Sequence, residues 1–249
     1  MWVCASTNVV HDARMTTDTN DRNVTAHWVD VECDGSSMRC YFAAPHAAGD
    51  MTPTVVLAMH LTGIDAWMRS IAHRFATEGF AIVIPDLYAR FHAPDGDVVD
   101  DYKQFIPFAQ KLDPAMVDRD VRAAAAWLRE RYPRSKTAIA GFCMGGVMAL
   151  TRTIGYRDVF SAAAVWYGAI RIDPKLVEIP VVASYGADDT GISTESVEAF
   201  RAALTVPNDV VMYPGAGHAF SDDTRPAYEK NAADDSWRRS IALLHRYLG

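Results

Sequence analysis

A cysteine set between glycines is the residue of this sequence best placed to act as a nucleophile. Cys143 is the centre of the segment 141–146, which reads GFCMGG, follows the aliphatic run Thr137–Ala140 and precedes a helical pattern. A strand-to-helix turn of the form G-x-nucleophile-x-G lifts its central side chain out of the sheet and leaves no room for side chains at the glycines. The positive end of the following helix favours negative charge on the sulfur. The alternative is a buried structural cysteine.

An acid and a histidine follow later aliphatic runs. The adjacent Asp188 and Asp189 come after the run Val181–Tyr185, and His218 comes after the run Val210–Tyr213. A nucleophile, an acid and a histidine in this chain order are typical of α/β-hydrolases. The histidine takes the proton of the thiol and later delivers it to the leaving group, while the carboxylate fixes the imidazole tautomer. We favour Asp189 as this acid and interpret Asp188 as a solvated turn residue.

Alternating strands and helices are the elements that must position these residues. Beyond Pro53, short aliphatic runs alternate with amphipathic stretches, which predicts a mainly parallel sheet covered by helices on both faces. Two earlier runs, Thr25–Cys33 and Met38–Ala43, flank a turn at 34–36 and predict an antiparallel hairpin at one edge of the sheet. The predicted fold class is therefore α/β, open and doubly wound. We expect the later strands at Thr54–Met59, Phe80–Ile84, Thr137–Ala140, Ala162–Tyr167, Val181–Tyr185 and Val210–Tyr213, and helices around Trp67–Phe75, at Pro114–Arg131 and at 145–155, 193–204 and 231–247.

Composition excludes several classes of protein. The chain has 249 residues, of which 50% are hydrophobic, so it can bury a large core and is not disordered as a whole. The net charge of −7 and the lack of a basic stripe argue against nucleic-acid binding. Uncharged apolar runs fall short of the ~20 residues of a membrane helix. The start of the chain has no positively charged front and only a broken apolar stretch, which is unlike a signal peptide. Four cysteines without a CxxC pair indicate reduced thiols, so we predict a cytoplasmic protein with a flexible leader at 1–22 and a single domain at 23–249.

Taken together, these motifs resemble the dienelactone hydrolase family. The resemblance rests on the GFCMGG turn, on PDLYAR at 85–90, on GADD at 186–189 and on GAGHAF at 215–220, and it extends from about residue 25 to the C-terminus. It implies an α/β-hydrolase fold and hydrolysis of an ester or lactone by a Cys–His–Asp triad, without a metal or organic cofactor. The resemblance carries this triad onto Cys143, His218 and Asp189. It also implies an oxyanion hole formed by the backbone N–H groups of Leu61 and Met144.

Two positions depart from the family's pattern. Members of the family usually carry a glutamate beside the resting cysteine, in the loop after the first parallel strand, where this chain has His60. The imidazole either supports a thiolate or only shapes the pocket. Members that cleave dienelactone hold its carboxylate with two arginines. Arg90 matches the first, but Asp222 occupies the place of the second and would repel a carboxylate, which Arg225 offers little prospect of replacing.

The sequence thus predicts a cysteine-dependent hydrolase that cleaves a small ester or lactone through a thioester acyl-enzyme. We expect His60, Tyr88 and Arg90 to bind the substrate, and a monomer or small homo-oligomer without nucleic-acid or membrane partners. Metal, ATP and dinucleotide motifs are not found, so no cofactor is expected. The alternatives are an esterase or thioesterase with a different acyl substrate and a catalytically silent fold that binds a ligand. A redox-sensing role for Cys143 lacks a resolving cysteine nearby in sequence.

Overall fold

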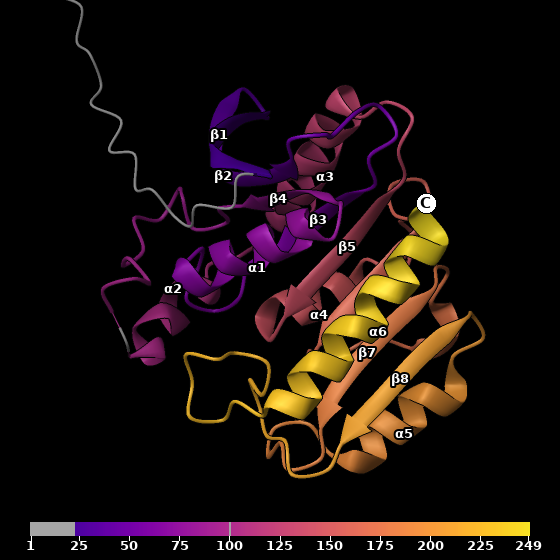
Figure 1. Cartoon of the computed structure of the whole chain (residues 1–249). Coiled ribbons are helices and arrows are strands. Elements are labelled where there is room, and N and C mark those ends of the chain that lie inside the picture. The colour runs from indigo at the N-terminus through magenta and orange to yellow at the C-terminus, as the bar shows by residue number, and fades with distance from the viewer. Residues whose placement is uncertain (1–22, 100) are drawn as a thin grey trace, which may run out of the picture.

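One eight-stranded sheet organises the chain (Figure 1). The structure is a computed structural model that describes residues 23–99 and 101–249, so the predicted leader at 1–22 lies outside the described residues. The strand order is β1-β2-β4-β3-β5-β6-β7-β8. The strands are β1 (Val24–Cys33), β2 (Ser36–Pro45), β3 (Thr54–Ala58), β4 (Ala81–Pro85), β5 (Thr137–Phe142), β6 (Ala162–Trp166), β7 (Val181–Gly186) and β8 (Asn208–Tyr213).

The sheet is parallel from β4 through β8 and antiparallel at its N-terminal edge. Strand β2 pairs antiparallel with both β1 and β4, and the turn between β1 and β2 contains Asp34 and Gly35 at φ of 51° and 74°. Strands β3, β5, β6, β7 and β8 continue in parallel, with β3 lying between β4 and β5. This arrangement confirms the predicted α/β fold with an antiparallel hairpin at one edge.

Helices cover both faces of the sheet (Figure 1). Helices α1 and α6 lie on one face, where the rings of Phe75 and Trp237 approach to 4.7 Å, and α3, α4 and α5 lie on the other. The short segment formed by η1 and α2 was not predicted from the sequence. The helices are α1 (Ala66–Thr77), η1 (Tyr102–Phe105), α2 (Ile106–Ala109), α3 (Pro114–Arg131), α4 (Met144–Thr151), η2 (Pro174–Leu176), α5 (Thr194–Ala203) and α6 (Lys230–Leu248).

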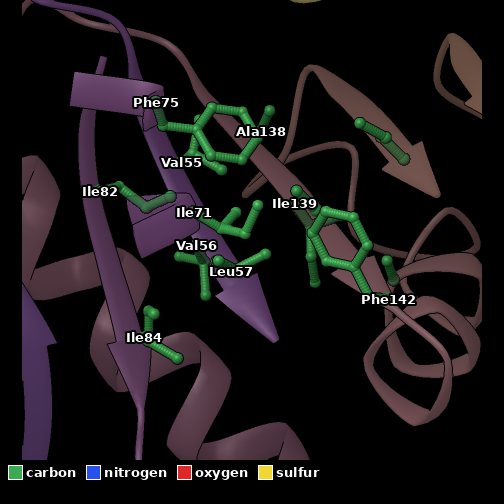
Figure 2. Packing of buried hydrophobic residues seen from close by; sticks show 14 of the residues in the cluster. Val55, Val56, Leu57, Ile71, Phe75, Ile82, Ile84, Ala138, Ile139 and Phe142 are labelled. Atoms are coloured by element: carbon green, nitrogen blue, oxygen red, sulfur yellow. The ribbon is translucent and has the colours of Figure 1, made fainter. Parts of the chain in front are cut away.

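The core lies along the central strands. Every residue of β3, β4 and β5 is buried, as expected of parallel strands covered on both faces. Figure 2 shows aliphatic and aromatic side chains from these strands and from α1 gathered in this core. Because close-packed cores resist deformation, the strands hold the loops at their ends in fixed positions.

The carboxyl ends of the parallel strands open onto one edge of the sheet. From β3 the chain crosses to β4 on one side, and from β4 it crosses back past β3 to β5 on the other side, so a topological switch point lies between β3 and β5. Binding sites of open α/β sheets form outside the strand ends at such a point. We therefore expect the functional residues in the loops after β3, β5, β7 and β8.

Candidate active site

The turn between β5 and α4 holds Cys143 in a strained backbone conformation. Its φ of 51° and ψ of −116° lie in a region that non-glycine residues rarely adopt, at a cost of about 1–3 kcal/mol. The surroundings hold this geometry: the Cys143 N–H donates to the carbonyl of Trp166 at 3.0 Å, and the neighbouring Phe142 ring packs between the rings of Trp67 and Trp166. The sulfur is thereby held outside the strand at the start of α4.

The glycines of this turn are required by close backbone approach. A Cβ at Gly141 would lie 2.1 Å from the carbonyl oxygen of Gly145, and a Cβ at Gly145 would lie 2.2 Å from the carbonyl oxygen of Ala58. Both distances are far below van der Waals contact, and both obstacles are backbone atoms. The glycine pattern therefore reflects the packing of α4 against the ends of β3 and β5.

Gly145→Ala tests this packing through stability. Alanine ordinarily stabilises a helix relative to glycine, but here the added methyl group would displace the backbone at the end of β3. We expect the free energy of unfolding, measured by urea denaturation, to fall by about 1–3 kcal/mol. Gly49→Ala is the matched control, since a Cβ at Gly49 would meet no atom within 4 Å. Equal stabilities of the two variants would contradict the proposed packing.

A continuous chain of hydrogen bonds joins Cys143, His218 and Asp189. The Nε2 atom of His218 lies 3.1 Å from the Cys143 sulfur, and its Nδ1 lies 2.7 Å from Oδ2 of Asp189. The other carboxylate oxygen of Asp189 accepts the N–H of Gly191 at 2.8 Å. Asp189 is buried, whereas Asp188 is exposed. The structure thus brings together the three residues that the sequence motifs singled out, with Asp189 rather than Asp188 on the imidazole.

The surroundings of His218 favour its protonated form. The hydrogen bond to the Cys143 sulfur, and after it the bond to Asp189, raises the pKa of His218 to about 9, although partial burial acts to lower it. The ring of Tyr167 lies 5.1 Å from the imidazole, and its hydroxyl lies 2.7 Å from that of Ser221. Sequence reasoning placed Tyr167 only at the end of a strand and missed it as a neighbour of the site.

The raised pKa of His218 predicts a pH-dependent contribution of Asp189 to stability. A histidine whose folded pKa exceeds its unfolded value of 6.5 contributes stability that is fully present below pH 6.5 and is lost as pH rises through about 9. Asp189→Asn removes the anionic partner, so the difference in Tm between the wild type and this variant should shrink across that window. Thermal unfolding monitored by circular dichroism at a series of pH values measures this difference. A difference that stays constant or grows with pH would contradict the ion pair.

A cavity of about 740 Å³ opens above the cysteine. Its walls are mostly apolar, and they include the α2 segment that the sequence did not predict. Cys143 and His218 are among the lining residues, and the side chains of Arg152 and Arg171 supply positive charge to the wall. The lining residues are Leu61, Ile106, Ala109, Gln110, Leu112, Pro114, Val117, Cys143, Met144, Val147, Met148, Thr151, Arg152, Tyr156, Tyr167, Ala169, Arg171, Gly191, Ile192 and His218.

The two residues of the predicted oxyanion hole line the same cavity as the sulfur. Leu61 follows β3, Met144 begins α4, and both line the cavity beside Cys143. Within the described ranges, neither N–H donates a hydrogen bond to another protein group. The Tyr88 hydroxyl donates to the Leu61 carbonyl at 3.0 Å and so braces this loop; burial raises the pKa of Tyr88, which keeps the hydroxyl protonated. Tyr88 thus contacts the predicted oxyanion loop and is not itself among the lining residues of this cavity.

His60 is engaged by an acid on its own loop. Its Nε2 lies 2.7 Å from Oδ2 of Asp65 and 2.8 Å from the hydroxyl of Thr62, and its ring stacks on that of Trp67. Burial alone would raise the pKa of Asp65, but the bonds from His60, Met68 and Thr62 outweigh burial and lower it. Among the described residues, no hydrogen bond joins His60 to the Cys143 sulfur, and His60 does not line the cavity. Sequence reasoning missed Asp65 as its partner.

Arg90 is also held away from the cavity. Its guanidinium makes a bidentate ion pair with the fully buried Asp120, at 2.7 and 2.8 Å, and the Cys33 thiol donates to the same carboxylate. Asp222 is buried and accepts from the N–H and hydroxyl of Thr224. Neither Arg90 nor Asp222 lines the cavity. The charge of Arg90 is therefore matched by a buried carboxylate, and the substrate contact expected of Arg90 stays a prediction.

The described part of the chain offers neither a metal cluster nor a membrane helix. None of its His, Cys, Asp and Glu side chains form a group of three or more that could hold a metal ion. Likewise, within residues 23–99 and 101–249, no helix is both long and apolar enough to cross a membrane.

The chain is similar in sequence and in fold to known proteins. A family model described as the dienelactone hydrolase family matches residues 38–248. "Putative carboxymethylenebutenolidase" of Salmonella typhimurium is 31% identical over 93% of this chain and 91% of the relative, and the Escherichia coli K12 protein of the same name is 30% identical over 93% and 90%. The crystal structure of a "Putative Dienelactone Hydrolase" from Klebsiella pneumoniae superposes with a TM-score of 0.81 at 28% identity, covering 90% of this chain and 99% of that one.

Proposed function

Since the chain belongs to the dienelactone hydrolase family, a family of ester and lactone hydrolases, we propose that it is a cysteine-dependent enzyme that cleaves a small ester or lactone through a thioester on Cys143. The observation that carries this proposal is the hydrogen-bonded chain from the Cys143 sulfur through His218 to the buried Asp189. This is the spatial order of a nucleophile, a general base and an orienting acid. A catalytic thiol must stay reduced, and we therefore place the enzyme in the cytoplasm.

Acylation requires the thiol proton to reside on Nε2 of His218, which lies 3.1 Å from the sulfur. The sulfur attacks the carbonyl carbon, a C–S bond forms, and the carbonyl oxygen gains negative charge. The N–H groups of Leu61 and Met144, which line the cavity, donate to that oxygen. When the tetrahedral intermediate collapses, the C–O bond of the ester breaks and the leaving alcohol takes the proton from His218. In a lactone, this alcohol remains part of the acyl group.

Deacylation uses the same groups with water as the nucleophile. His218 removes a proton from water, the oxygen attacks the thioester carbon, and the sulfur departs as the acid is released. Asp189 keeps its hydrogen bond to Nδ1 throughout, so Nε2 is the nitrogen that exchanges protons with the sulfur, the leaving group and water.

Selective alkylation combined with a hydrolysis screen tests the proposal. Burial raises the pKa of Cys33 to about 11 and that of Cys40 to about 12, so these thiols are inert near neutral pH, whereas Cys143 is partly exposed. All proteins in the test carry Cys4→Ser, since Cys4 lies outside the described residues. We expect turnover of γ-lactones or p-nitrophenyl esters that disappears in step with a single iodoacetamide adduct.

Two outcomes would overturn the proposal. Full turnover after stoichiometric labelling of Cys143 would show that the sulfur is not the nucleophile. Absence of turnover on every lactone and ester would instead favour a ligand-binding protein built on the same fold.

A further inference from the structure

One face of α4 leads from the nucleophile to a buried arginine. Met144, Val147, Met148, Thr151 and the C-cap residue Arg152 all line the cavity. Their spacing of three and four residues places them on one side of the helix. The wall of the cavity therefore runs continuously from the catalytic sulfur to the guanidinium of Arg152.

Arg152 is buried without an anionic partner. Only 5% of the residue is exposed, its Nη1 donates to the Met148 carbonyl at 3.2 Å, and its Nε has no hydrogen-bond partner. Among the described residues, no carboxylate lies within ion-pair distance of it. The nearby Asp118 is already engaged by the Tyr156 hydroxyl and by Nε of Arg122. Burying a cation without an opposite charge nearby destabilises the protein. An anion bound from solution would supply that charge beside Arg152.

The charge of the cavity wall also favours an anionic ligand. The protein carries a net charge of −7, yet among the described residues the cavity is lined by Arg152, Arg171 and His218 and by no aspartate or glutamate. The ring of Tyr156 lies 5.8 Å from the Arg152 guanidinium, near the outer limit of a cation–π contact, and offsets little of its charge. A positive, largely apolar cavity in an acidic protein suits a small organic anion.

We propose that Arg152 is a specificity-determining residue that binds a carboxylate on the acyl part of the substrate, so that the enzyme prefers esters or lactones of short dicarboxylic acids. This inference rests on the proposed function. The bond from Nη1 to the Met148 carbonyl folds the guanidinium back to the level of Met148. That level is five residues from Cys143, or about 7.5 Å along the helix axis. The carboxylate therefore lies a few atoms from the carbonyl that Cys143 attacks.

This position differs from that of the arginine expected from the sequence. Arg90 forms an ion pair with Asp120 and does not line the cavity. Arg152 lines the cavity, and its Nε–H has no hydrogen-bond acceptor. We therefore expect different effects on substrate binding when each arginine is replaced. Loss of Arg152 should weaken binding of anionic substrates selectively, and loss of Arg90 should affect anionic and neutral substrates alike.

A matched pair of esters tests the assignment. Mono-p-nitrophenyl glutarate carries a carboxylate at the end of its acyl chain, and p-nitrophenyl pentanoate carries a methyl group there. Arg152→Gln should raise KM for the glutarate ester by about 10- to 100-fold and change KM for the pentanoate ester less than about twofold, with kcat nearly unchanged for both. Arg152→Lys should recover part of the loss because it retains the charge. Arg201→Gln, at an exposed position of α5, controls for the change in net charge and should leave both substrates unaffected.

The outcomes separate this inference from the proposed function. Equal losses on both esters, or none, would overturn the role of Arg152 while leaving the hydrolase intact. If the wild type cleaves neither ester, the wider screen of lactones and esters still decides the proposed function, and calorimetric binding of the glutarate ester to Cys143→Ala protein, with and without Arg152→Gln, decides the inference. If Arg152→Gln does not fold, the wild-type ratio of kcat/KM for the two esters decides: a preference for the pentanoate ester would overturn the assignment.

Discussion

Replacing Cys143 by alanine is expected to lower kcat by about 10³-fold or more, because the substitution removes the sulfur that we propose forms the acyl-enzyme. The fold should persist, since alanine keeps the Cβ at the strained turn and the surrounding contacts are made by the backbone and by Phe142. Steady-state hydrolysis of the best substrate from the screen measures the loss. A parallel thermal melt shows whether the variant is folded.

The residual activity of Cys143→Ala, read together with its thermal melt, shows whether Cys143 performs the attack. A folded Cys143→Ala protein that retains more than about a tenth of wild-type kcat would show that another group performs the attack. A variant that loses activity together with its melting transition would instead show that the side chain is needed for folding, which the packing of the turn does not suggest.

His218→Ala should be almost as damaging, with a fall in kcat of about 10³-fold or more. Without the imidazole, the sulfur loses its proton acceptor at 3.1 Å, and neither the leaving alcohol nor the attacking water has a proton partner. The double variant Cys143→Ala/His218→Ala should be scarcely worse than either single variant, because the two residues act as a unit. The same hydrolysis assay measures all three proteins.

His46→Ala is the matched control for this prediction, because His46 is exposed and far along the chain from the site. Its kcat should equal that of the wild type. If His218→Ala retained wild-type kcat, or if the two single losses multiplied in the double variant, the cysteine and histidine would not be working together.

Much of the fold could be predicted from the sequence because the responsible signals are local. The aliphatic runs that became β3 through β7 are buried on both faces. The start of α3 is marked by Asp113, whose carboxylate caps the helix ahead of Pro114. The turn around Cys143 could be recognised for the same reason: Gly141 and Gly145 are required by contacts between segments that a strand-to-helix turn always brings together.

The roles of His60, Arg90 and Arg152 could not be predicted, because they depend on partners that spacing alone does not reveal. His60 meets Asp65 through the folding of its own loop, and Arg90 meets Asp120 from a helix thirty residues further along the chain. The position of Arg90 matched the family's pattern, but its charge is matched by Asp120. For Arg152, the helical spacing from Met144 was visible in the sequence, whereas its burial without a carboxylate was not.

The most direct test of the account is to trap and locate the acyl-enzyme. Wild-type protein is mixed with excess p-nitrophenyl acetate, quenched in acid within the first turnover, digested and analysed by mass spectrometry, with Cys143→Ala as the control. We predict an acetyl adduct on the peptide that contains Cys143, cleavable by hydroxylamine as a thioester is, and absent from the control. Turnover accompanied by an adduct on another residue, or an adduct that persists in Cys143→Ala, would contradict the assignment of Cys143 as the nucleophile.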